Sequence, residues 1–282
     1  MTVFKTIRNL LLTCAMVSSQ NVSAQERIEE QLGWTLSAQA YTFKLYTLAE
    51  ALEKMHNAGL RSVEIYNSQI IGGGMDGAVD FKMDSTKGVE LLNLLRSKGV
   101  KGVAVGVLKA NTAEEWHQIF EFASAMGMKW INTEPIEEYL PLIGELATKY
   151  KITVGIHNHP KPSTYWEPKA VLEAIKKANS PYVGACADIG HWVRSGLDPV
   201  DCIRQYDGHL VTMHFKDLKE KSATTHDVHW GQGVCNVPAI IDELKRQGFS
   251  GNISVEYEYN WENNASDVAE CVRYFREYLR SR

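Results

Sequence analysis

The sequence contains few of the features that mark nucleic-acid-binding, membrane-spanning or disulfide-rich proteins. Its formal net charge is −4 and its pI is about 6.2, so no basic excess favours nucleic acid or an anionic membrane surface as a partner. The apolar run near the N-terminus, residues 10–17, is too short to cross a bilayer. Only five of the 282 residues are cysteine, and their spacing shows no CxxC pattern, so the sequence predicts no disulfide framework.

Nucleotide-binding loops are missing as well. No G-x-G-x-x-G motif follows an expected strand, and the glycine run at residues 72–74 lacks the lysine and the spacing of a P-loop. We find no linker and no low-complexity tract. With 44% hydrophobic and 23% charged residues, the chain has an ordinary globular composition, and its length suits one large α/β barrel or two small domains.

The N-terminal segment differs from the rest of the chain. Lys5 and Arg8 precede the apolar run, and small residues follow up to Ala24. This order is typical of a secretory signal peptide. We expect residues 1–24 to be removed near Ala24, so that a mature domain of residues 25–282 is periplasmic or secreted. A disordered or helical extension is the alternative.

Beyond residue 34, short β-branched or aromatic runs alternate with stretches of helical periodicity that often end at glycine. Regular alternation of this kind demands parallel strands with helical crossovers, and eight pairs in this length favour a single (β/α)₈ TIM barrel. The expected strand–helix pairs are 35–43 and 48–57, 62–66 and 85–97, 102–108 and 113–125, 130–133 and 136–149, 152–157 and 169–178, 182–188 and 199–206, 210–215 and 237–247, and 252–257 and 266–279.

Four of the expected strands have a side chain of the metal-ligand type at or near their C-terminal end: Glu134, Asp188, His214 and Glu256. Active sites of this fold are built where strands end and the following loops begin. Two glutamates, one aspartate and one histidine at that end would form a divalent-cation site of oxygen and nitrogen ligands. Glu134 alone could equally be a helix N-terminal residue. Asp188 follows a run so apolar that its charge needs a cation or an arginine beside it.

Further polar residues are expected at the same end of the barrel and are candidates for binding substrate. His229 belongs to a loop, residues 226–233, that could equally be a solvated excursion. The candidates are Glu64, His157, His159, His191, Lys216, His229 and Glu258. Five tryptophans are candidate walls on which a sugar could stack: Trp116, Trp166, Trp192, Trp230 and Trp261.

Taken together, the motifs at residues 131–134, 188–191, 214–217, 231–233 and 254–258 resemble the xylose-isomerase-like TIM-barrel family of sugar isomerases and epimerases. The resemblance implies that Glu134, Asp188, His214 and Glu256 bind one divalent metal ion. Mn²⁺ is the first choice, with Mg²⁺, Co²⁺ or Zn²⁺ as alternatives. It also implies that His191 contacts substrate, and that Glu134 and Glu256 lie on opposite faces of the substrate as the proton-transfer pair.

The endonuclease IV branch of the same barrel holds three zinc ions, and this sequence shares only part of its pattern. Asp188 and His191 match one motif, and Asp227 and His229 match another. Asn67 and the segment 102–109 supply none of the histidines that the branch has at the second and third strands. A three-zinc cluster is therefore not expected.

These features predict a metal-dependent sugar isomerase or epimerase that acts through an enediolate. Export and the lack of an arginine cluster favour an unphosphorylated sugar or keto-sugar as the small-molecule partner. A keto-glycoside lyase or a sugar dehydratase would use the same metal site and is the nearest alternative. A non-catalytic carbohydrate-binding barrel is a third. No nucleic acid and no membrane span are expected, and a homo-oligomer is left open.

Overall fold

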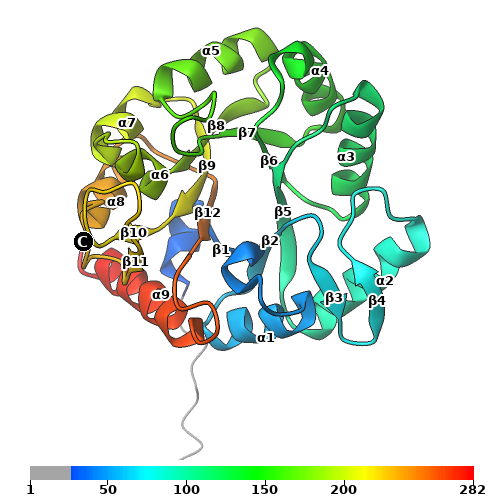
Figure 1. The fold of residues 1–282 in the computed structure, drawn as a ribbon, viewed down its shortest axis with the longest axis horizontal. Coiled ribbons are helices and arrows are strands. Elements are labelled where there is room, and N and C mark those ends of the chain that lie inside the picture. Colours follow the sequence, from blue (N-terminus) through cyan, green and yellow to red (C-terminus); the bar gives the residue numbers. More distant parts are fainter. Residues whose placement is uncertain (1–26) are drawn as a thin grey trace, which may run out of the picture.

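Eight parallel strands close into a barrel in the computed structural model, which describes residues 27–282 (Figure 1). The predicted signal peptide, residues 1–24, lies outside the described residues. Neighbouring strands follow the order β1-β12-β9-β8-β7-β6-β5-β2 around the barrel. The barrel strands are β1 (Thr35–Gln39), β2 (Ser62–Ile65), β5 (Lys101–Leu108), β6 (Trp130–Thr133), β7 (Thr153–His157), β8 (Val183–Asp188), β9 (Leu210–Phe215) and β12 (Asn252–Val255).

The helices form a ring outside the strands (Figure 1). Several begin where the sequence supplies a capping side chain: Thr47 and Glu50 form a reciprocal capping box at α1, and Thr112 accepts a backbone hydrogen bond at α3. No helix within residues 27–282 is long and apolar enough to cross a membrane. The helices are α1 (Leu48–Asn57), α2 (Ser85–Ser97), α3 (Ala113–Ala125), α4 (Leu140–Tyr150), α5 (Pro168–Ala178), α6 (Ile189–Arg194), α7 (Pro199–Gln205), α8 (Val237–Arg246) and α9 (Ala265–Arg280).

The structure confirms the predicted TIM barrel and differs from the expected elements in detail. The first strand ends at Gln39 and continues as the 3₁₀ turn η2 (Ala40–Phe43), and α4 is preceded by a second 3₁₀ turn, η3 (Glu137–Tyr139). Helix α6 was not expected. Neither were the hairpin of β3 (Ile70–Gly72) and β4 (Met75–Ala78) and the pairing of β10 (Asp217–Leu218) with β11 (Asp227–Val228). A further 3₁₀ turn, η1 (Ile28–Leu32), precedes β1.

Three of the five tryptophans proposed as sugar-stacking walls are buried in the core. Trp116 and Trp192 have no exposed surface and Trp230 is 1% exposed, so the prediction is wrong for these three. Their large apolar rings fill space inside the domain rather than at its surface. Trp166 and Trp261 are partly exposed.

Candidate functional site

A cavity of about 530 Å³ opens at the ends of the barrel strands where their C-terminal residues lie. One part of its wall follows β7, β8 and β12 and consists of His159, His191, Arg194, Glu256 and Glu258. Another part follows β1, β2 and β5 and includes Gln39, Tyr41, Tyr66, Asn67 and Gly106. The position agrees with the general rule that TIM-barrel sites form at this face.

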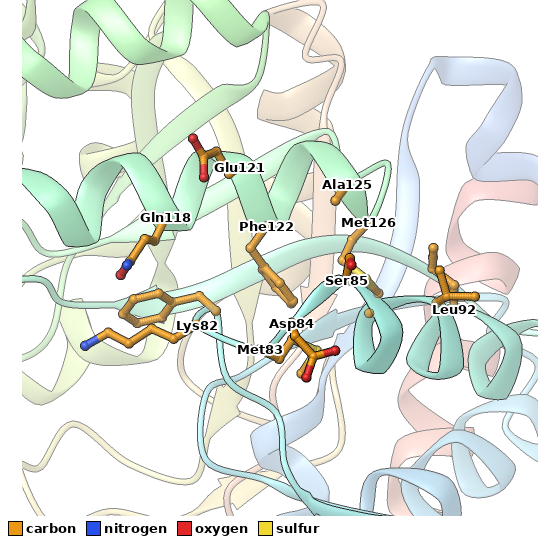
Figure 2. Close-up of a pocket in the computed structure, with 13 residues that line it drawn as sticks. Lys82, Met83, Asp84, Ser85, Leu92, Gln118, Glu121, Phe122, Ala125 and Met126 are labelled. Carbon is orange, nitrogen blue, oxygen red and sulfur yellow. The ribbon is translucent and has the colours of Figure 1, made fainter.

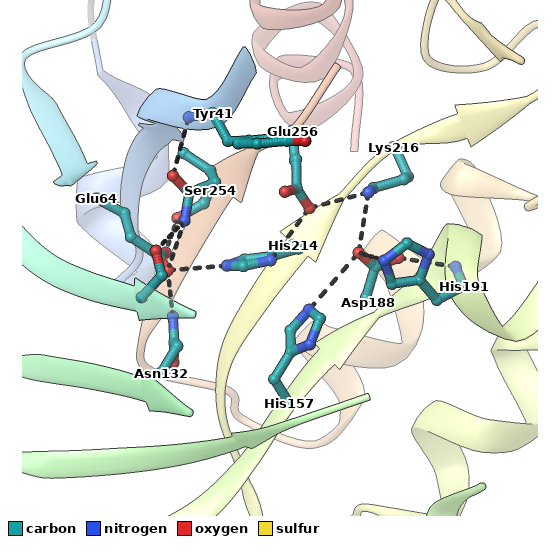
Figure 3. Close-up of polar contacts among 12 residues, drawn as sticks. Tyr41, Glu64, Asn132, His157, Asp188, His191, His214, Lys216, Ser254 and Glu256 are labelled. Atoms are coloured by element: carbon teal, nitrogen blue, oxygen red, sulfur yellow. Dashed lines mark hydrogen bonds and ion pairs between the residues drawn. The ribbon is translucent and has the colours of Figure 1, made fainter. Parts of the chain in front are cut away.

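Asp188 is the last residue of β8 and is held by both its main chain and its side chain. Its carboxylate Oδ1 accepts a hydrogen bond of 2.8 Å from the backbone N–H of His191, which caps helix α6. The side chain of Asn158 bonds to the backbone N–H and C=O of Asp188, at 2.8 and 2.9 Å. These contacts leave Oδ2 directed at the polar cluster shown in Figure 3.

His214, on β9, is oriented by two carboxylates on opposite sides of its ring. Nε2 lies 2.9 Å from Oε1 of Glu64, and Nδ1 lies 3.1 Å from Oε2 of Glu256. Burial opposes the charged imidazolium, but the Glu64 carboxylate raises the pKa of His214 well above its ordinary value. A divalent cation would have to displace the proton from Nδ1, while the Glu64 carboxylate accepts the proton that remains on Nε2.

Glu64 is fully buried beneath the cavity, so it holds His214 rather than facing the open mouth. Its two oxygens also accept hydrogen bonds from the side chains of Gln39, Asn132 and Ser254, at 3.2, 2.9 and 2.6 Å. Burial opposes ionisation, yet His214 and these donors lower the pKa of Glu64. A buried carboxylate with this many partners can remain charged.

Lys216 supplies a buried ammonium group between three carboxylates (Figure 3 shows two of them by label). Nζ lies 3.0 Å from Oδ2 of Asp188, 2.9 Å from Oε2 of Glu256 and 3.2 Å from Oε2 of Glu258. Burial favours the neutral amine, but these carboxylates raise the pKa of Lys216 well above its usual value. Three carboxylates around one ammonium leave an excess of negative charge.

The geometry of the cluster fits a divalent cation. Oδ2 of Asp188, Nδ1 of His214 and Oε2 of Glu256 belong to buried residues, and a group of ligand atoms from these three residues lies within 4.8 Å of one another. These three atoms make no hydrogen bond of normal geometry with other atoms of residues 27–282. Two carboxylate oxygens, one imidazole nitrogen and excess negative charge together form a donor set that suits Mn²⁺, Zn²⁺ or a similar ion.

His157 lies beside this cluster and has unused ligand atoms. It is 1% exposed, and neither ring nitrogen has a hydrogen-bond partner within residues 27–282. Nε2 lies 3.7 Å from Oδ2 of Asp188, and the rings of His157 and His214 have centroids 4.7 Å apart. Burial lowers the pKa of His157 to about 4, so the ring is neutral near pH 7, as a metal ligand must be.

Glu134 lies in a neighbouring group, with His157 and His159, rather than with the other three predicted ligands. Its Oε1 accepts hydrogen bonds from the backbone N–H of His159 at 3.0 Å and from the hydroxyl of Ser163 at 2.8 Å, and Oε2 lies 3.0 Å from Nζ of Lys109. Burial opposes ionisation, but His159 and Lys109 lower the pKa of Glu134 strongly. The structure therefore brings three predicted ligands together and keeps the fourth carboxylate ionised nearby.

The predicted substrate-binding residues are distributed over several places. His159, His191 and Glu258 line the cavity. His157, Lys216 and Glu64 are buried around or beneath the cluster. His229 lies 2.9 Å from Asp267 of α9 and is not part of the cavity lining.

Sequence reasoning missed several residues that line the cavity, notably Tyr41, Tyr66, Asn67 and Arg194. Arg194 ends the short helix α6 and contacts Glu258 at 2.7 Å and Asp227 at 3.2 Å. The sequence could have indicated Arg194, because it lies only six residues after Asp188. One short helix, α6, therefore places both residues at the mouth of the barrel. Tyr66 directly follows β2 and Tyr41 lies two residues after β1, so the positional rule used for the acidic residues could have found both.

A second hollow lies at the periphery, between α2 and α3 (Figure 2). Its volume is about 420 Å³, and its lining is largely apolar, with Phe81, Met83, Leu92, Phe122 and Met126. Within residues 27–282, none of the groups that could hold a metal ion lies in it. The polar chemistry of the chain is concentrated at the barrel mouth.

Comparison with known proteins agrees with this architecture. Residues 52–278 match the family described as xylose isomerase-like TIM barrel. The structure of an uncharacterised protein from Parabacteroides distasonis ATCC 8503 is 32% identical, with a TM-score of 0.71, and the match covers 87% of this chain and 99% of that one. Inosose dehydratase of Lacticaseibacillus casei is 22% identical over 80% of this chain and 87% of its own. Inosose isomerase of Halalkalibacterium halodurans is 24% identical over 77% and 85%. The chain belongs to the xylose isomerase-like TIM barrel family.

Proposed function

We propose that the protein is a divalent-metal-dependent sugar isomerase or epimerase that acts on an unphosphorylated sugar or keto-sugar. The observation that carries the proposal is the convergence of Asp188, His214 and Glu256 on one buried point at the mouth of the barrel. Relatives named inosose isomerase and inosose dehydratase support a reaction on a sugar-like ketone or polyol. Export of the mature protein, to a periplasm or out of the cell, remains part of the proposal.

Four side chains would hold the cation: His157, Asp188, His214 and Glu256. His157 takes the place first predicted for Glu134, because its free nitrogens lie next to Asp188 whereas Glu134 is engaged by His159 and Lys109. When bound, a divalent cation would stabilise the negative charge that develops on a substrate oxygen as the neighbouring carbon loses its proton.

The remaining residues would position the substrate and move protons. Glu134 is buried and ionised beside His159 of the cavity wall, and it is the carboxylate that would accept a proton from a substrate carbon. Glu256 was the other predicted member of the pair; the Lys216 ammonium, acting against the effect of burial, lowers its pKa to about 2 and keeps it ionised. His159 and His191 line the mouth and can hydrogen-bond substrate hydroxyls.

One feature of the cavity wall supports the choice of an unphosphorylated substrate. Arg194 is the arginine of the cavity wall, and its guanidinium is already engaged by Glu258 and Asp227. A phosphate at this wall would have to compete with two carboxylates for that group. A neutral sugar meets no such obstacle.

A lyase or dehydratase is the second candidate. Removal of the same carbon-bound proton leads to elimination if a leaving group lies on the next carbon. The similarity to inosose dehydratase favours this candidate, and it would use the same residues.

Hydrogen exchange with solvent tests the proposal. Purified protein loaded with Mn²⁺ and a panel of free ketoses and aldoses would be incubated in D₂O and followed by NMR. We expect deuterium to enter one substrate carbon. Glu134→Gln should reduce the rate by at least about 100-fold while circular dichroism remains unchanged, because general-base catalysis typically contributes 10²–10⁴-fold.

Glu137→Gln, which changes an exposed glutamate three residues away, is the matched control and should exchange at the wild-type rate. Exchange at the wild-type rate in Glu134→Gln would sink the assigned role. No exchange with any sugar, with metal bound, would sink the proposed function itself.

A further inference from the structure

The cavity at the barrel mouth is larger than one sugar ring requires. An engineered protein cavity of about 150 Å³ holds one benzene molecule, and a pyranose has about twice as many non-hydrogen atoms as benzene. One sugar ring therefore needs on the order of 300 Å³ by this measure. The cavity measures about 530 Å³. Space remains after one ring has been seated at the polar cluster.

The extra space is bounded by aromatic side chains on the β1 and β2 side of the mouth. The proposed metal ligands extend from β7, β8, β9 and β12, whereas Tyr41 and Tyr66 follow β1 and β2. In the closed barrel, β1 lies across from β7 and β2 lies across from β8, while β1 also pairs with β12, the strand that precedes Glu256. A ring bound at the polar cluster thus leaves the second part of the cavity facing Tyr41 and Tyr66.

These two tyrosines belong to a braced aromatic group. The rings of Tyr41 and Tyr66 pack edge to face with centroids 5.5 Å apart, and Tyr41 packs in the same way against Trp261 at 5.8 Å. Nζ of Lys44 lies 3.6 Å from the ring centroid of Trp261 and donates a hydrogen bond of 3.2 Å to the hydroxyl of Tyr41. A wall held in this way offers a ring-sized apolar surface at low cost in side-chain entropy.

We propose that the substrate carries a second ring, joined to the reacting sugar, and that this ring packs against Tyr41 and Tyr66. The substrate is then a keto-glycoside, or a disaccharide whose reducing ring reacts, because the reacting ring must keep a carbonyl next to the carbon that loses its proton. A second sugar ring and an aryl group share the flat apolar face that such a wall recognises. The inference rests on the proposed function in one respect: the reacting sugar is the ring that lies at the metal cluster.

Calorimetric titration of the Mn²⁺-loaded protein with matched pairs of glycosides tests this proposal. The probes are the methyl and phenyl β-glycosides of glucose, galactose and xylose, together with cellobiose and lactose. In at least one sugar series, we expect the two-ring compound to bind at least tenfold more tightly than the methyl glycoside. A larger gain in affinity for phenyl glycosides identifies the second ring as an aryl group, and a larger gain in affinity for disaccharides identifies it as a sugar.

Variants locate the second ring. Tyr66→Ala and Tyr41→Ala should each reduce the affinity gap, the ratio of the Kd of the one-ring ligand to that of the two-ring ligand, to less than threefold. Tyr66→Phe should keep this gap. Tyr259→Ala is the matched control, because Tyr259 is exposed, stacks on His226 and does not line the cavity. It should leave the gap unchanged.

Three results would overturn the proposal: equal affinity for methyl and two-ring glycosides in every series, no binding of any two-ring compound, or an affinity gap that survives both alanine variants.

Binding affinity tests the aromatic subsite, and solvent exchange tests the proposed reaction. A two-ring preference without deuterium exchange, either with the free sugars or at the reducing ring of cellobiose and lactose, would reject the proposed reaction and keep the aromatic subsite. Deuterium exchange without a two-ring preference would do the reverse.

Discussion

Glu64 shows how one residue can matter to a metal site without touching the metal or the substrate. Its carboxylate is buried, accepts from three neutral side chains and faces Nε2 of His214. The contact selects which imidazole nitrogen points to Asp188 and Glu256. Outer partners of this kind typically change metal affinity 10–100-fold when they are removed.

We therefore expect Glu64→Gln to weaken Mn²⁺ or Zn²⁺ binding about 10–100-fold, measured by calorimetry. The amide keeps the size of the side chain but loses its charge and presents a donor where only acceptors fit. Glu53→Gln, on the exposed face of α1, is the control. Unchanged affinity in Glu64→Gln would mean that His214 does not depend on this carboxylate for its orientation.

At the scale of structural elements, the segment between β9 and α8 folds around a single side chain. Asp217 accepts four backbone hydrogen bonds of 2.9–3.0 Å, from Leu218, Gly231, Gly233 and Cys235. A Cβ at Gly233 would lie 2.3 Å from Oδ1 of Asp217, so only glycine fits that close approach. The Gly-Gln-Gly motif thus folds around Asp217.

Asp217→Asn should loosen this loop because an amide nitrogen replaces one of the two accepting oxygens and faces backbone donors. Each buried donor left without an acceptor costs about 1–3 kcal/mol. We expect a loss of a few kcal/mol in the free energy of unfolding, measured by urea denaturation, and faster amide hydrogen exchange at residues 231–235. Asp201→Asn, on the exposed surface of α7, should change neither. Wild-type exchange in the loop of Asp217→Asn would show that the loop has other anchors.

The elements also show what the sequence could and could not predict. Strands β6 and β9 and helices α2 and α3 have the predicted bounds, because the hydrophobic periodicity of each segment and the residues at its ends indicate the same element. Helix α6 was missed because its six residues overlap the Asp188–His191 motif and are too few for a helical period. Three predicted ligands meet, but Glu134 follows β6, and β7 lies between β6 and β8 in the barrel. His157 of β7 is therefore nearer to Asp188, a consequence of strand order that spacing along the chain does not reveal.

At the scale of the whole molecule, the fold and the proposed metal site draw on different interactions. The barrel is closed by backbone pairing, and its helices cover an extensive apolar core that includes Phe120, Phe215 and Phe275. Lys216 already supplies one positive charge to the carboxylates of the cluster. Removing the metal should therefore lower stability without unfolding the domain.

We expect protein treated with EDTA to keep its far-ultraviolet circular dichroism and to unfold at a lower temperature than protein with saturating Mn²⁺. A ligand at 1,000 times its Kd stabilises the folded state by about 4 kcal/mol, which corresponds to a Tm shift of roughly 8–16 °C for a domain of this size. Lys216→Met should make the metal-free form less stable by about 3–5 kcal/mol, since it leaves the buried carboxylates of Asp188 and Glu256 without their ammonium. The loss should be smaller with Mn²⁺ bound, because the cation then lies between Asp188 and Glu256. Calorimetric scans of both proteins, with and without metal, measure all four values, and Lys219→Met, at an exposed position, is the control.

A Tm that does not respond to Mn²⁺ in the wild-type protein would contradict the proposed metal site. An equal loss of stability with and without metal in Lys216→Met would show that Lys216 and the cation do not share these carboxylates.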